Sequence, residues 1–228
     1  MFTLSEVKRS YGQYCTLAKT LDVVGGRWTL LVVRELLGGP RRFGDLMDGL
    51  PGIGTNLLSE RLRELQDAGV IEKRVLPPPA GSTVYELTER GRELRGAALT
   101  LTRWGLESAG LEAPAKDEEF RVHWLMVTGQ AAFRPEAAGD APLTCEVRTS
   151  DSDVSHFRIE DGELGIFQGP ASDPDLALSG TPSALIRLFT GRVAPKKAIE
   201  NGVVLHGDLE TLRRAVEAFG LSEQSDVA

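Results

Sequence analysis

The sequence is poor in cysteine, and it lacks long apolar runs. The two cysteines, Cys15 and Cys145, lie far apart in a chain of 228 residues and are too few for a disulfide framework. This usage suits a reducing compartment, so we expect a cytoplasmic protein. No run of about 18 apolar residues occurs, and no membrane span is expected. The first residues also lack the apolar core of a signal peptide, which argues against export.

Patterns typical of catalysis and of metal binding are equally scarce. The sequence has no G-x-S-x-G, P-loop or C-x-x-C motif. The three histidines, His123, His156 and His206, are scattered without the spacing of metal ligands. We therefore expect a protein that is not an enzyme and that has no cofactor and no metal site.

Charge is distributed unevenly along the chain, whose net charge is −7. Residues 1–112 hold 15 Lys and Arg against 14 Asp and Glu, a net of +1, whereas residues 113–228 hold 11 against 19, a net of −8. Local patches rather than total charge steer association with DNA. The near-neutral first half predicts modest non-specific DNA affinity and a need for two copies acting together.

The length suits two modest domains. Composition changes at LEAPAKDEEF, residues 111–120, which predicts a linker. We place the first domain at 1–112 and the second at 113–228, with an α+β fold class for the whole chain.

The first half follows the order of a winged helix-turn-helix. Periodicity predicts four helices, at 16–24, 27–37, 43–50 and 56–70. Arg27 and Trp28 are predicted to open the second of them. Strands at 70–75 and 83–88 flank a proline-rich tip, and Thr88 is predicted to cap a long final helix. Such a module places one helix in the major groove of DNA.

The helix over 56–70 decides the functional interpretation. Thr55 is predicted as its N-cap, and its apolar stripe consists of Leu58, Leu62 and Leu65. A recognition helix presents its N-terminal half to the bases. The candidates for base contacts on the opposite face are Thr55, Asn56, Ser59 and Arg63. Asparagine can read adenine, and arginine can read guanine, each through two hydrogen bonds. The alternative interpretation is an ordinary amphipathic surface helix.

Other basic residues are candidates for phosphate contacts. Arg41 and Arg42 precede the helix over 43–50, where the helix macrodipole disfavours them, which indicates another partner such as phosphate. Solvated surface arginines are the alternative. The remaining candidates for phosphate contacts are Arg61, at the edge of the leucine stripe, and Lys73 and Arg74, on the first strand. The hairpin tip, 77–82, has no charge, so the wing would rely on its backbone and its strand residues.

The long final helix predicts a dimer. Its apolar stripe, with Ala98 on the flank, consists of Leu94, Ala97, Leu101 and Trp104. The small module has little core left to cover this stripe, so we expect a partner subunit to do so. A twofold dimer would place two recognition helices roughly 34–36 Å apart, which suits a pseudo-palindromic operator. The alternative is packing of the stripe against the second domain.

These residues resemble the HxlR family of bacterial winged-helix regulators, relatives of the MarR group. The resemblance covers about residues 11–110 and rests on the Tyr-Cys opening, G-G-R-W-T, R-R-F-G-D-L, N-L-L-S-x-R-L-x-E-L and Y-x-L-T-x-x-G, in that order. It implies a dimeric, sequence-specific transcription factor that dimerises through the first and last helices of the module. Thr16 stands where the family often has proline.

Cys15 corresponds to a cysteine that some members of the family use to sense oxidants or electrophiles. This chemistry requires a thiolate, which Lys19, one helical turn on, and a helix N-terminus would both favour. The alternative is a small half-buried residue without a sensing role. Cys145, in the other domain, is not expected to be its disulfide partner.

The second half predicts an α+β layered domain, in which helices cover one face of a sheet. The predicted strands are at 143–150, 154–160, 162–169, 175–180 and 203–207. The predicted helices are at 120–133, 181–191, 194–202 and 208–220, with Thr181 as a cap.

Four patterns over about 143–220 are similar to sterol carrier protein-like domains. They are strand-D-G-strand, P-D-L-x-L-S-G-T, L-x-x-L-x-T-G and A-I-x-N-G-x-V-x-L-x-G-D. The resemblance implies a hydrophobic tunnel for an acyl chain, a sterol or another apolar molecule. Candidates for its lining are Trp124, Leu125, Phe133, Phe157, Ile166, Phe167, Leu185, Leu188 and Phe189. The alternative is a solid core, since a drug-sized ligand needs ~300–1,000 Å³ of open volume.

The sequence thus predicts a cytoplasmic, homodimeric regulator that binds double-stranded DNA and represses rather than activates. An apolar effector in the second domain would control it. Two other interpretations stay open. One is a lipid or sterol carrier that uses the helical module only for dimerisation, and the other is a regulator with a filled second domain and Cys15 as its sensor.

Overall fold

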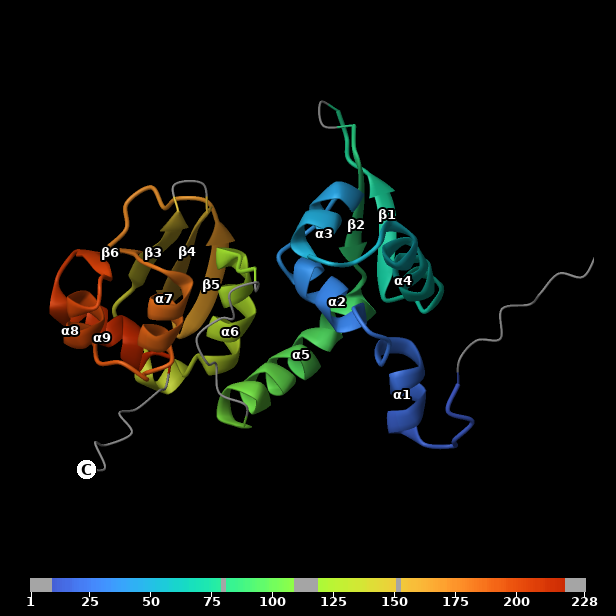
Figure 1. Cartoon of the computed structure of the whole chain (residues 1–228), viewed down its shortest axis with the longest axis horizontal. Helices are drawn as coiled ribbons and strands as arrows, with labels where there is room; N and C mark the ends of the chain where they lie inside the picture. Colours follow the sequence, from blue (N-terminus) through green and yellow to red (C-terminus); the bar gives the residue numbers. More distant parts are fainter. Residues whose placement is uncertain (1–9, 79–80, 109–118, 151–152, 220–228) are drawn as a thin grey trace, which may run out of the picture. The chain divides into compact units, whose positions relative to one another are not determined.

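A computed structural model of the chain describes residues 10–78, 81–108, 119–150 and 153–219. The chain forms two compact units that divide between Gly96 and Ala97 (Figure 1). Most of the predicted linker, at 111–120, lies outside the described residues. Within the described part of the chain, no helix is both long enough and apolar enough to span a membrane.

The first unit is a helix-turn-helix followed by a hairpin and a long helix. Its elements are α1 (Thr16–Val24), α2 (Thr29–Leu37), α3 (Phe43–Gly49), α4 (Thr55–Asp67), β1 (Ile71–Val75), β2 (Thr83–Leu87) and α5 (Glu89–Ser108), which continues into the second unit. The strands β1 and β2 pair antiparallel, from Ile71 opposite Leu87 to Val75 opposite Thr83. The predicted winged helix-turn-helix is confirmed.

The core of the first unit forms where α2, α3 and α4 meet the base of the hairpin. The leucine stripe of α4 is fully buried there, because its three members recur at helical spacing and face the other elements. The residues buried with it include Val32, Val33, Leu36, Leu46, Leu50, Ile71 and Leu87. This packing leaves the opposite face of α4 to the solvent.

Two predicted helix starts are wrong. Gly54, not Thr55, is the N-cap of α4, since Gly54 has an extended backbone and its carbonyl accepts the first helical bond from the Leu58 amide at 2.9 Å. The second helix begins at Thr29 because Trp28 has a φ of 77°, in the left-handed region that bulky residues rarely adopt. The Arg27 guanidinium lies 5.5 Å from the Trp28 ring centroid.

The start of α5 is fixed to the base of the hairpin. The Thr88 hydroxyl accepts a hydrogen bond from the Gly91 amide at 3.0 Å and donates to the Gly69 carbonyl at 2.7 Å. The Thr88 amide donates to the Val70 carbonyl at 3.0 Å. A Cβ atom at Gly91 would collide with the same Val70 carbonyl, so the close approach of helix and strand requires glycine. The predicted Thr88 cap is confirmed.

The second unit is a five-stranded sheet with helices. Its sheet contains β3 (Leu143–Ser150), β4 (Asp153–Glu160), β5 (Glu163–Gln168), β6 (Leu176–Ser179) and β7 (Val204–His206) in the order β5-β4-β3-β6-β7. Only the β3–β6 pair among these described strands is parallel. The helices are η1 (Val122–Trp124), α6 (Leu125–Ala132), η2 (Pro135–Ala137), α7 (Pro182–Phe189), α8 (Pro195–Glu200) and α9 (Leu209–Glu217).

The predicted strands of this unit are confirmed to within a residue or two, and so is the Thr181 cap, whose hydroxyl accepts from the Ala184 amide at 3.3 Å. The predicted single helix over 120–133 is wrong in its first part. A 3₁₀ turn occupies Val122–Trp124 before α6 begins, and Phe133 is already extended.

The core of the second unit lies between the sheet and its helices. Figure 1 shows α6, α7 and α9 on one side of the sheet. Alternate residues of β4, Ser155, Phe157 and Ile159, are buried on that side. The ring of Phe157 meets the rings of Phe189 and Phe219 edge-on, at centroid distances of 5.8 and 5.1 Å. These rings fill much of the space under α6.

Candidate functional site

The exposed face of α4 carries a row of polar side chains. Thr55, Asn56, Ser59 and Arg63 are all exposed, while the leucine stripe on the other face is buried. Thr55, Ser59 and Arg63 are four residues apart, so they lie along one line on the helix. The Ser59 hydroxyl donates to the Thr55 carbonyl at 2.9 Å, which fixes its rotamer while its oxygen stays able to accept. The row offers donors and acceptors of the kinds that read base edges.

Arg61 lies apart from this row, although it is on the same helix. Its side chain is only 13% exposed, and the guanidinium forms ion pairs with Glu64 and, at 3.4 Å, with Glu60. It also lies against Gly26, between α1 and α2. Its Nε is buried without a hydrogen-bond partner among the described residues. The structure therefore places Arg61 in the packing of the module and not on its polar face.

The two arginines before α3 have different surroundings. Arg41 bridges to Tyr85 of β2 through two backbone hydrogen bonds of 2.8 and 2.9 Å, and its Nε donates to the Glu35 carbonyl at 3.3 Å. That carbonyl belongs to the last turn of α2, where a cation suits the macrodipole. Arg42 is exposed, and its backbone amide donates to the Asp45 carboxylate at 2.9 Å. Only Arg42 of this pair presents an exposed side chain.

The wing contributes two cations on β1. Lys73 is exposed, and its Nζ lies 5.8 Å from the centroid of the Tyr85 ring on β2. Arg74 forms an ion pair with Glu86 across the hairpin, and its side chain is 46% exposed. An ion pair at such exposure contributes little to stability. Residues 79–80 of the predicted tip lie outside the described part of the chain.

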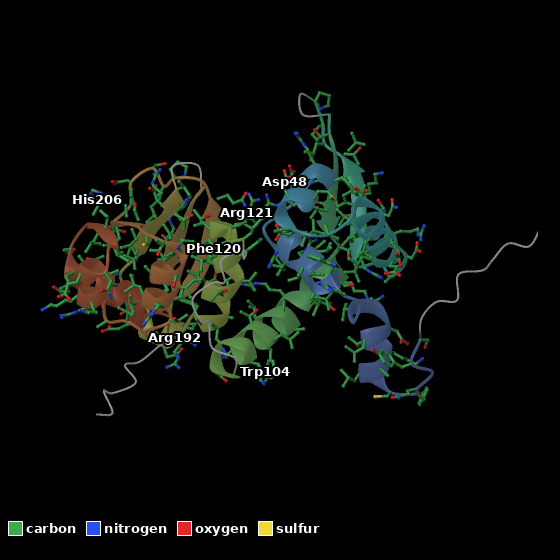
Figure 2. The ribbon with its side chains drawn as sticks, in the orientation of Figure 1. Asp48, Trp104, Phe120, Arg121, Arg192 and His206 are labelled. Atoms are coloured by element: carbon green, nitrogen blue, oxygen red, sulfur yellow. The ribbon has the colours of Figure 1, made fainter. Side chains whose placement is uncertain are left out.

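The predicted dimer residues lie on α5. Leu101 and Trp104 are 52% and 66% exposed, Ala97 is exposed, and Leu94 is half-buried. Figure 2 shows the Trp104 side chain at the surface of α5. The first helix has an apolar surface as well, since Leu17 on α1 is 66% exposed and Tyr14 before it is fully exposed. Leu17 and Tyr14 belong to the first unit, and Leu101 and Trp104 lie on the part of α5 that belongs to the second. Exposed large apolar side chains of this kind are typical of an interface.

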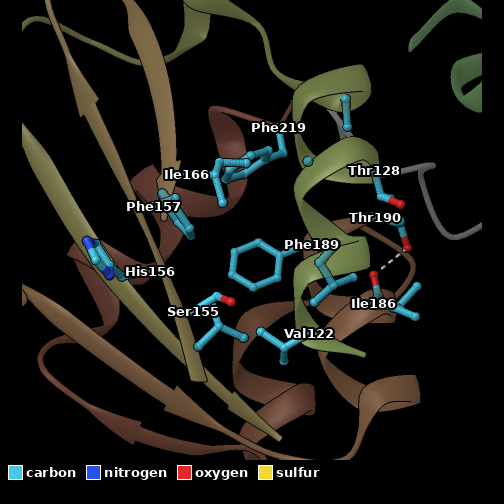
Figure 3. A pocket seen from close by; sticks show the side chains of 14 residues that line it. Val122, Thr128, Ser155, His156, Phe157, Ile166, Ile186, Phe189, Thr190 and Phe219 are labelled. Carbon is cyan, nitrogen blue, oxygen red and sulfur yellow. Dashed lines mark hydrogen bonds between the residues drawn. The ribbon is translucent and has the colours of Figure 1, made fainter. Parts of the chain in front are cut away.

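A small apolar cavity lies between α6, α7 and the helix-facing side of β4 (Figure 3). Its volume is about 60 Å³. Four of the predicted lining residues surround it, namely Leu125, Phe157, Ile166 and Phe189. None of the described residues that line it is Asp, Glu, Lys or Arg. The volume is well below the ~300–1,000 Å³ of a drug-sized site, so a sterol or a long acyl chain does not fit it in this conformation.

The other predicted lining residues lie elsewhere. Leu185 and Leu188 are fully buried in the core, and Phe133 is half-buried with its ring 6.1 Å from that of Phe219. The Trp124 ring meets the ring of Phe120 edge-on. Phe167 is 49% exposed and stacks on His156 at 5.1 Å. Sequence patterns therefore identified apolar positions of the unit without separating core from cavity.

Other residues that line the cavity, among them Ser155, Thr190 and Phe219, were not in the predicted set. The sequence carried a signal for Ser155. It shares a face with Phe157 and Ile159 in an alternating strand, so a hydroxyl stands at a position where the pattern predicts an apolar side chain.

The two cysteines differ in their surroundings. Cys15 is exposed and is the N-cap of α1. Cys145 is fully buried in β3, and burial, together with the neighbouring Glu146, raises the pKa of its thiol. A thiol held in its protonated form is a poor nucleophile. Of the two, only Cys15 is placed for reaction with a solute.

A hairpin wing and a helix with a polar, exposed N-terminal half define the first unit as a DNA-binding module of the winged helix-turn-helix class. Residues 23–112 match the HxlR-like helix-turn-helix family. An uncharacterised HTH-type transcriptional regulator of Synechocystis sp. is 38% identical over 94 residues, which cover 41% of this chain and 70% of that protein. The chain belongs to the HxlR-like helix-turn-helix family and is a DNA-binding transcriptional regulator.

Two further comparisons concern proteins of Bacillus subtilis. The uncharacterised HTH-type transcriptional regulator YybR is 32% identical over 124 residues, covering 51% of this chain and 99% of YybR. The structure of the reduced form of the transcriptional regulator YodB covers 42% of this chain and 95% of that chain, with 30% identity and a TM-score of 0.38.

In the second unit, residues 125–214 match the MDMPI C-terminal domain family. The predicted likeness to sterol carrier proteins stays a prediction.

Proposed function

We propose that the chain is a homodimeric, ligand-responsive transcriptional repressor that reads a pseudo-palindromic operator with α4. The observation that carries this proposal is the row of exposed polar side chains on α4 opposite a buried leucine stripe. A helix whose inner face is fixed by a core can present its outer face to DNA without rearrangement, which lowers the entropic cost of binding.

Within this row, Asn56 and Arg63 are proposed to read base edges, and Thr55 and Ser59 to add hydrogen bonds to bases or phosphates. Their exposure supports these roles. Arg42, Lys73 and Arg74 are exposed on neighbouring elements and are proposed to contact phosphates. Arg41 and Arg61 are better explained as structural residues, because their guanidinium groups already have partners within the module.

The proposed dimer uses α1 and α5. The exposure of Leu17, Leu101 and Trp104 supports it, because burying apolar surface contributes about 25 cal/mol per Å². A twofold axis would pair two α4 helices with two half-sites about one turn of DNA apart. We take the DNA-binding and dimerisation domain to extend to residue 112, where the family match also ends.

The second unit, which we take as residues 113–228, is proposed to bind the effector. The apolar cavity between α6 and β4 supports this role, and its small volume favours a compact molecule over a sterol. A coupling of about 1–3 kcal/mol between effector and operator would change the affinity for DNA about 5–150-fold.

The test is fluorescence anisotropy of the full chain with the DNA upstream of its own gene, and with scrambled DNA of the same length as control. Salt concentration is varied, because each phosphate contact contributes a slope of about −0.9 to log K against log salt. Tight binding that prefers the native sequence supports the proposal. Equal, weak and salt-sensitive binding to both DNAs contradicts a nearby operator, and the same assay is then run on genomic fragments.

The exposure of Cys15 favours a second candidate function, a regulator that responds to oxidants or electrophiles. On this alternative, an oxidant releases the wild-type protein from its operator and leaves Cys15→Ser bound. Release of both proteins, or of neither, contradicts Cys15 as the sensor. Cys145→Ser is the matched control, since its thiol is buried.

A further inference from the structure

The junction between α1 and α2 (Figure 1), residues 25–28, packs beside α4. A Cβ atom at Gly26 would lie 3.4 Å from Nη1 of Arg61, which is near the middle of α4. A Cβ atom at Gly52, in the turn before α4, would lie 3.8 Å from Cη2 of Trp28. These two contacts bracket the N-terminal half of α4. The α1–α2 junction therefore runs alongside the turns of the helix that are proposed to enter the major groove.

Trp28 is the fixed point of the α1–α2 junction. Its φ of 77° lies in a region that bulky residues rarely adopt, and such a backbone persists only where the surrounding structure holds it. Its side chain is half-buried and packs against the core cluster that contains Ile53 and Leu58. Because these residues flank the start of α4, the Trp28 ring has a set position relative to that helix.

Arg27 is the cation that this ring carries. Arg27 is exposed, and its Cζ lies over the Trp28 ring at 5.5 Å from the centroid. A guanidinium over the face of an indole is held by a cation–π interaction, while its N–H groups stay able to donate to an anion. Holding a long side chain in place before binding lowers the entropic cost of the contact that it makes. Arg27 is thus a preorganised cation beside α4.

The acidic side chains of α4 do not neutralise this cation. The carboxylates of Glu60 and Glu64 both form ion pairs with Arg61. Within the described part of the chain, no ion pair engages the Arg27 guanidinium. Its positive charge therefore contributes to the local potential beside α4, which matters because the first half of the chain has a net charge of only +1.

The geometry of DNA supplies the anion. The major groove of B-DNA is about 12 Å wide, and an α-helix with its side chains is about 10–12 Å across, so a recognition helix fills the groove. The walls of the groove are the two phosphate backbones. A cation on a neighbouring element, level with the N-terminal half of that helix, meets a wall and not the base edges.

We infer that Arg27 binds a phosphate of the operator backbone beside α4, and that Trp28 is the positioning residue that holds its guanidinium there. This inference rests on the proposed role of α4 as the recognition helix. It adds a DNA contact from the α1–α2 junction, an element to which no DNA contact was assigned. A phosphate contact of this kind strengthens binding to every sequence and carries no base preference.

The test is fluorescence anisotropy of the full chain with two duplexes, the DNA upstream of its own gene and a scrambled duplex of the same length, over a range of salt concentrations. Arg27→Gln removes the charge and keeps a polar side chain. We expect it to weaken binding to both duplexes by a similar factor, about five- to tenfold at low salt. The slope of log K against log salt should become shallower by about 0.9 for each Arg27 in contact, hence about 1.8 for a dimer.

Two further variants serve as controls. Arg27→Lys keeps the charge, so its salt slope should stay close to that of the wild type. Arg213→Gln removes an exposed arginine from α9 and should leave both affinity and slope unchanged, which separates a contact from a change in net charge. Arg27 and Arg213 are both exposed, so the thermal unfolding midpoints of all three variants should match the wild type.

Unchanged affinity and slope for Arg27→Gln would overturn the inference and leave the role of α4 intact. Weaker binding with the wild-type slope would also overturn it, because a loss without counterion release indicates a structural effect. A loss confined to the upstream DNA would overturn the phosphate contact in favour of a base contact. A wild-type chain without salt-dependent binding to either duplex would contradict the proposed function itself, whatever the variants do.

Discussion

The carboxylate of Glu35 in α2 occupies the space in which Gly49 of α3 would carry a side chain. Glu35 is 2% exposed, and its Oε1 lies 2.7 Å from Nη2 of Arg34, which also donates to the Gly49 carbonyl at 3.2 Å. A buried carboxylate needs such a partner, because an uncompensated charge in a core is strongly destabilising. The Glu35 carboxylate is therefore packed between α2 and α3, the two helices that precede α4.

We expect Gly49→Ala to destabilise the first unit by about 1–3 kcal/mol, because the added Cβ would collide with the Glu35 carboxylate in a packed core. Urea unfolding of the full chain, followed by circular dichroism, measures the change. Gly44→Ala is the matched control on the same helix. A Cβ there meets open space, and alanine favours helix by up to ~1 kcal/mol. Equal stability of the two variants would contradict the role of this contact.

Replacing Arg63 by alanine should weaken operator binding by about 1–3 kcal/mol and relax specificity at one base position. The reason is the loss of a guanidinium from the exposed face of α4. Anisotropy with a set of operators mutated at single positions measures both effects. Arg213→Ala removes an exposed arginine from α9 and should leave the affinity unchanged. An unchanged affinity for Arg63→Ala would mean that another face of the module enters the groove.

Replacing Arg61, in contrast to Arg63, should lower the stability of the protein and leave its base preference unchanged. Arg61→Ala removes a side chain that is 13% exposed and packs against Gly26, so we expect a loss of about 1–2 kcal/mol of stability from packing. Base preference should stay as in the wild type. Unfolding experiments and the same set of operators provide the two measurements. A variant of normal stability that binds every operator more weakly and with a shallower salt slope would instead restore the predicted phosphate contact.

Charged substitutions on α5 should produce monomers. Leu101→Glu and Trp104→Glu each place a carboxylate on a helix surface that we propose to be buried between subunits. Light scattering coupled to size-exclusion chromatography measures the mass. Val75→Glu makes the same change at a residue that is 66% exposed on the wing and should leave the dimer intact. A dimer that survives both α5 variants would place the interface elsewhere.

The N-cap of α9 predicts a pH dependence of stability. The Asp208 carboxylate accepts hydrogen bonds from Thr211, through its hydroxyl at 2.6 Å and its amide at 2.9 Å, and these lower the pKa of Asp208 in the folded state. Because the pKa of Asp208 is lower in the folded state, the cap stabilises the fold fully at pH values above the unfolded-state pKa of about 3.9. This stabilisation is lost as the pH falls through the folded-state pKa.

Asp208→Ala should therefore lower the thermal unfolding midpoint at neutral pH, and the difference from wild type should shrink below about pH 4. Glu163→Ala, at the start of β5, is the control for removing an exposed carboxylate from this unit. A difference for Asp208→Ala that is the same at every pH would show that the cap acts without its charge.

Much of the fold follows from local patterns, because faces and ends of elements depend on residues close in sequence. The leucine stripe of α4, the cap at Thr88 and the alternation of β4 are of this kind. Contacts between residues that are distant along the chain do not follow from such local patterns. Arg61 and Arg63 are both candidates for DNA contacts by sequence, yet Arg61 is 13% exposed and lies against Gly26, which is distant along the chain. A hydrophobicity pattern likewise does not distinguish a core residue such as Leu185 from a residue that lines the cavity, such as Phe189.

The junction at Thr88 and Gly91 gives the wing its direction. The helix start is bonded to Gly69, and the Gly91 backbone packs against the Val70 carbonyl, so the first turn of α5 is held at the base of the hairpin. The angle between α5 and the strands β1 and β2 is therefore set at this junction. A side chain at position 91 would push the helix away from the strand and change that angle, although Gly91 is not among the residues proposed to contact DNA, a partner subunit or a ligand.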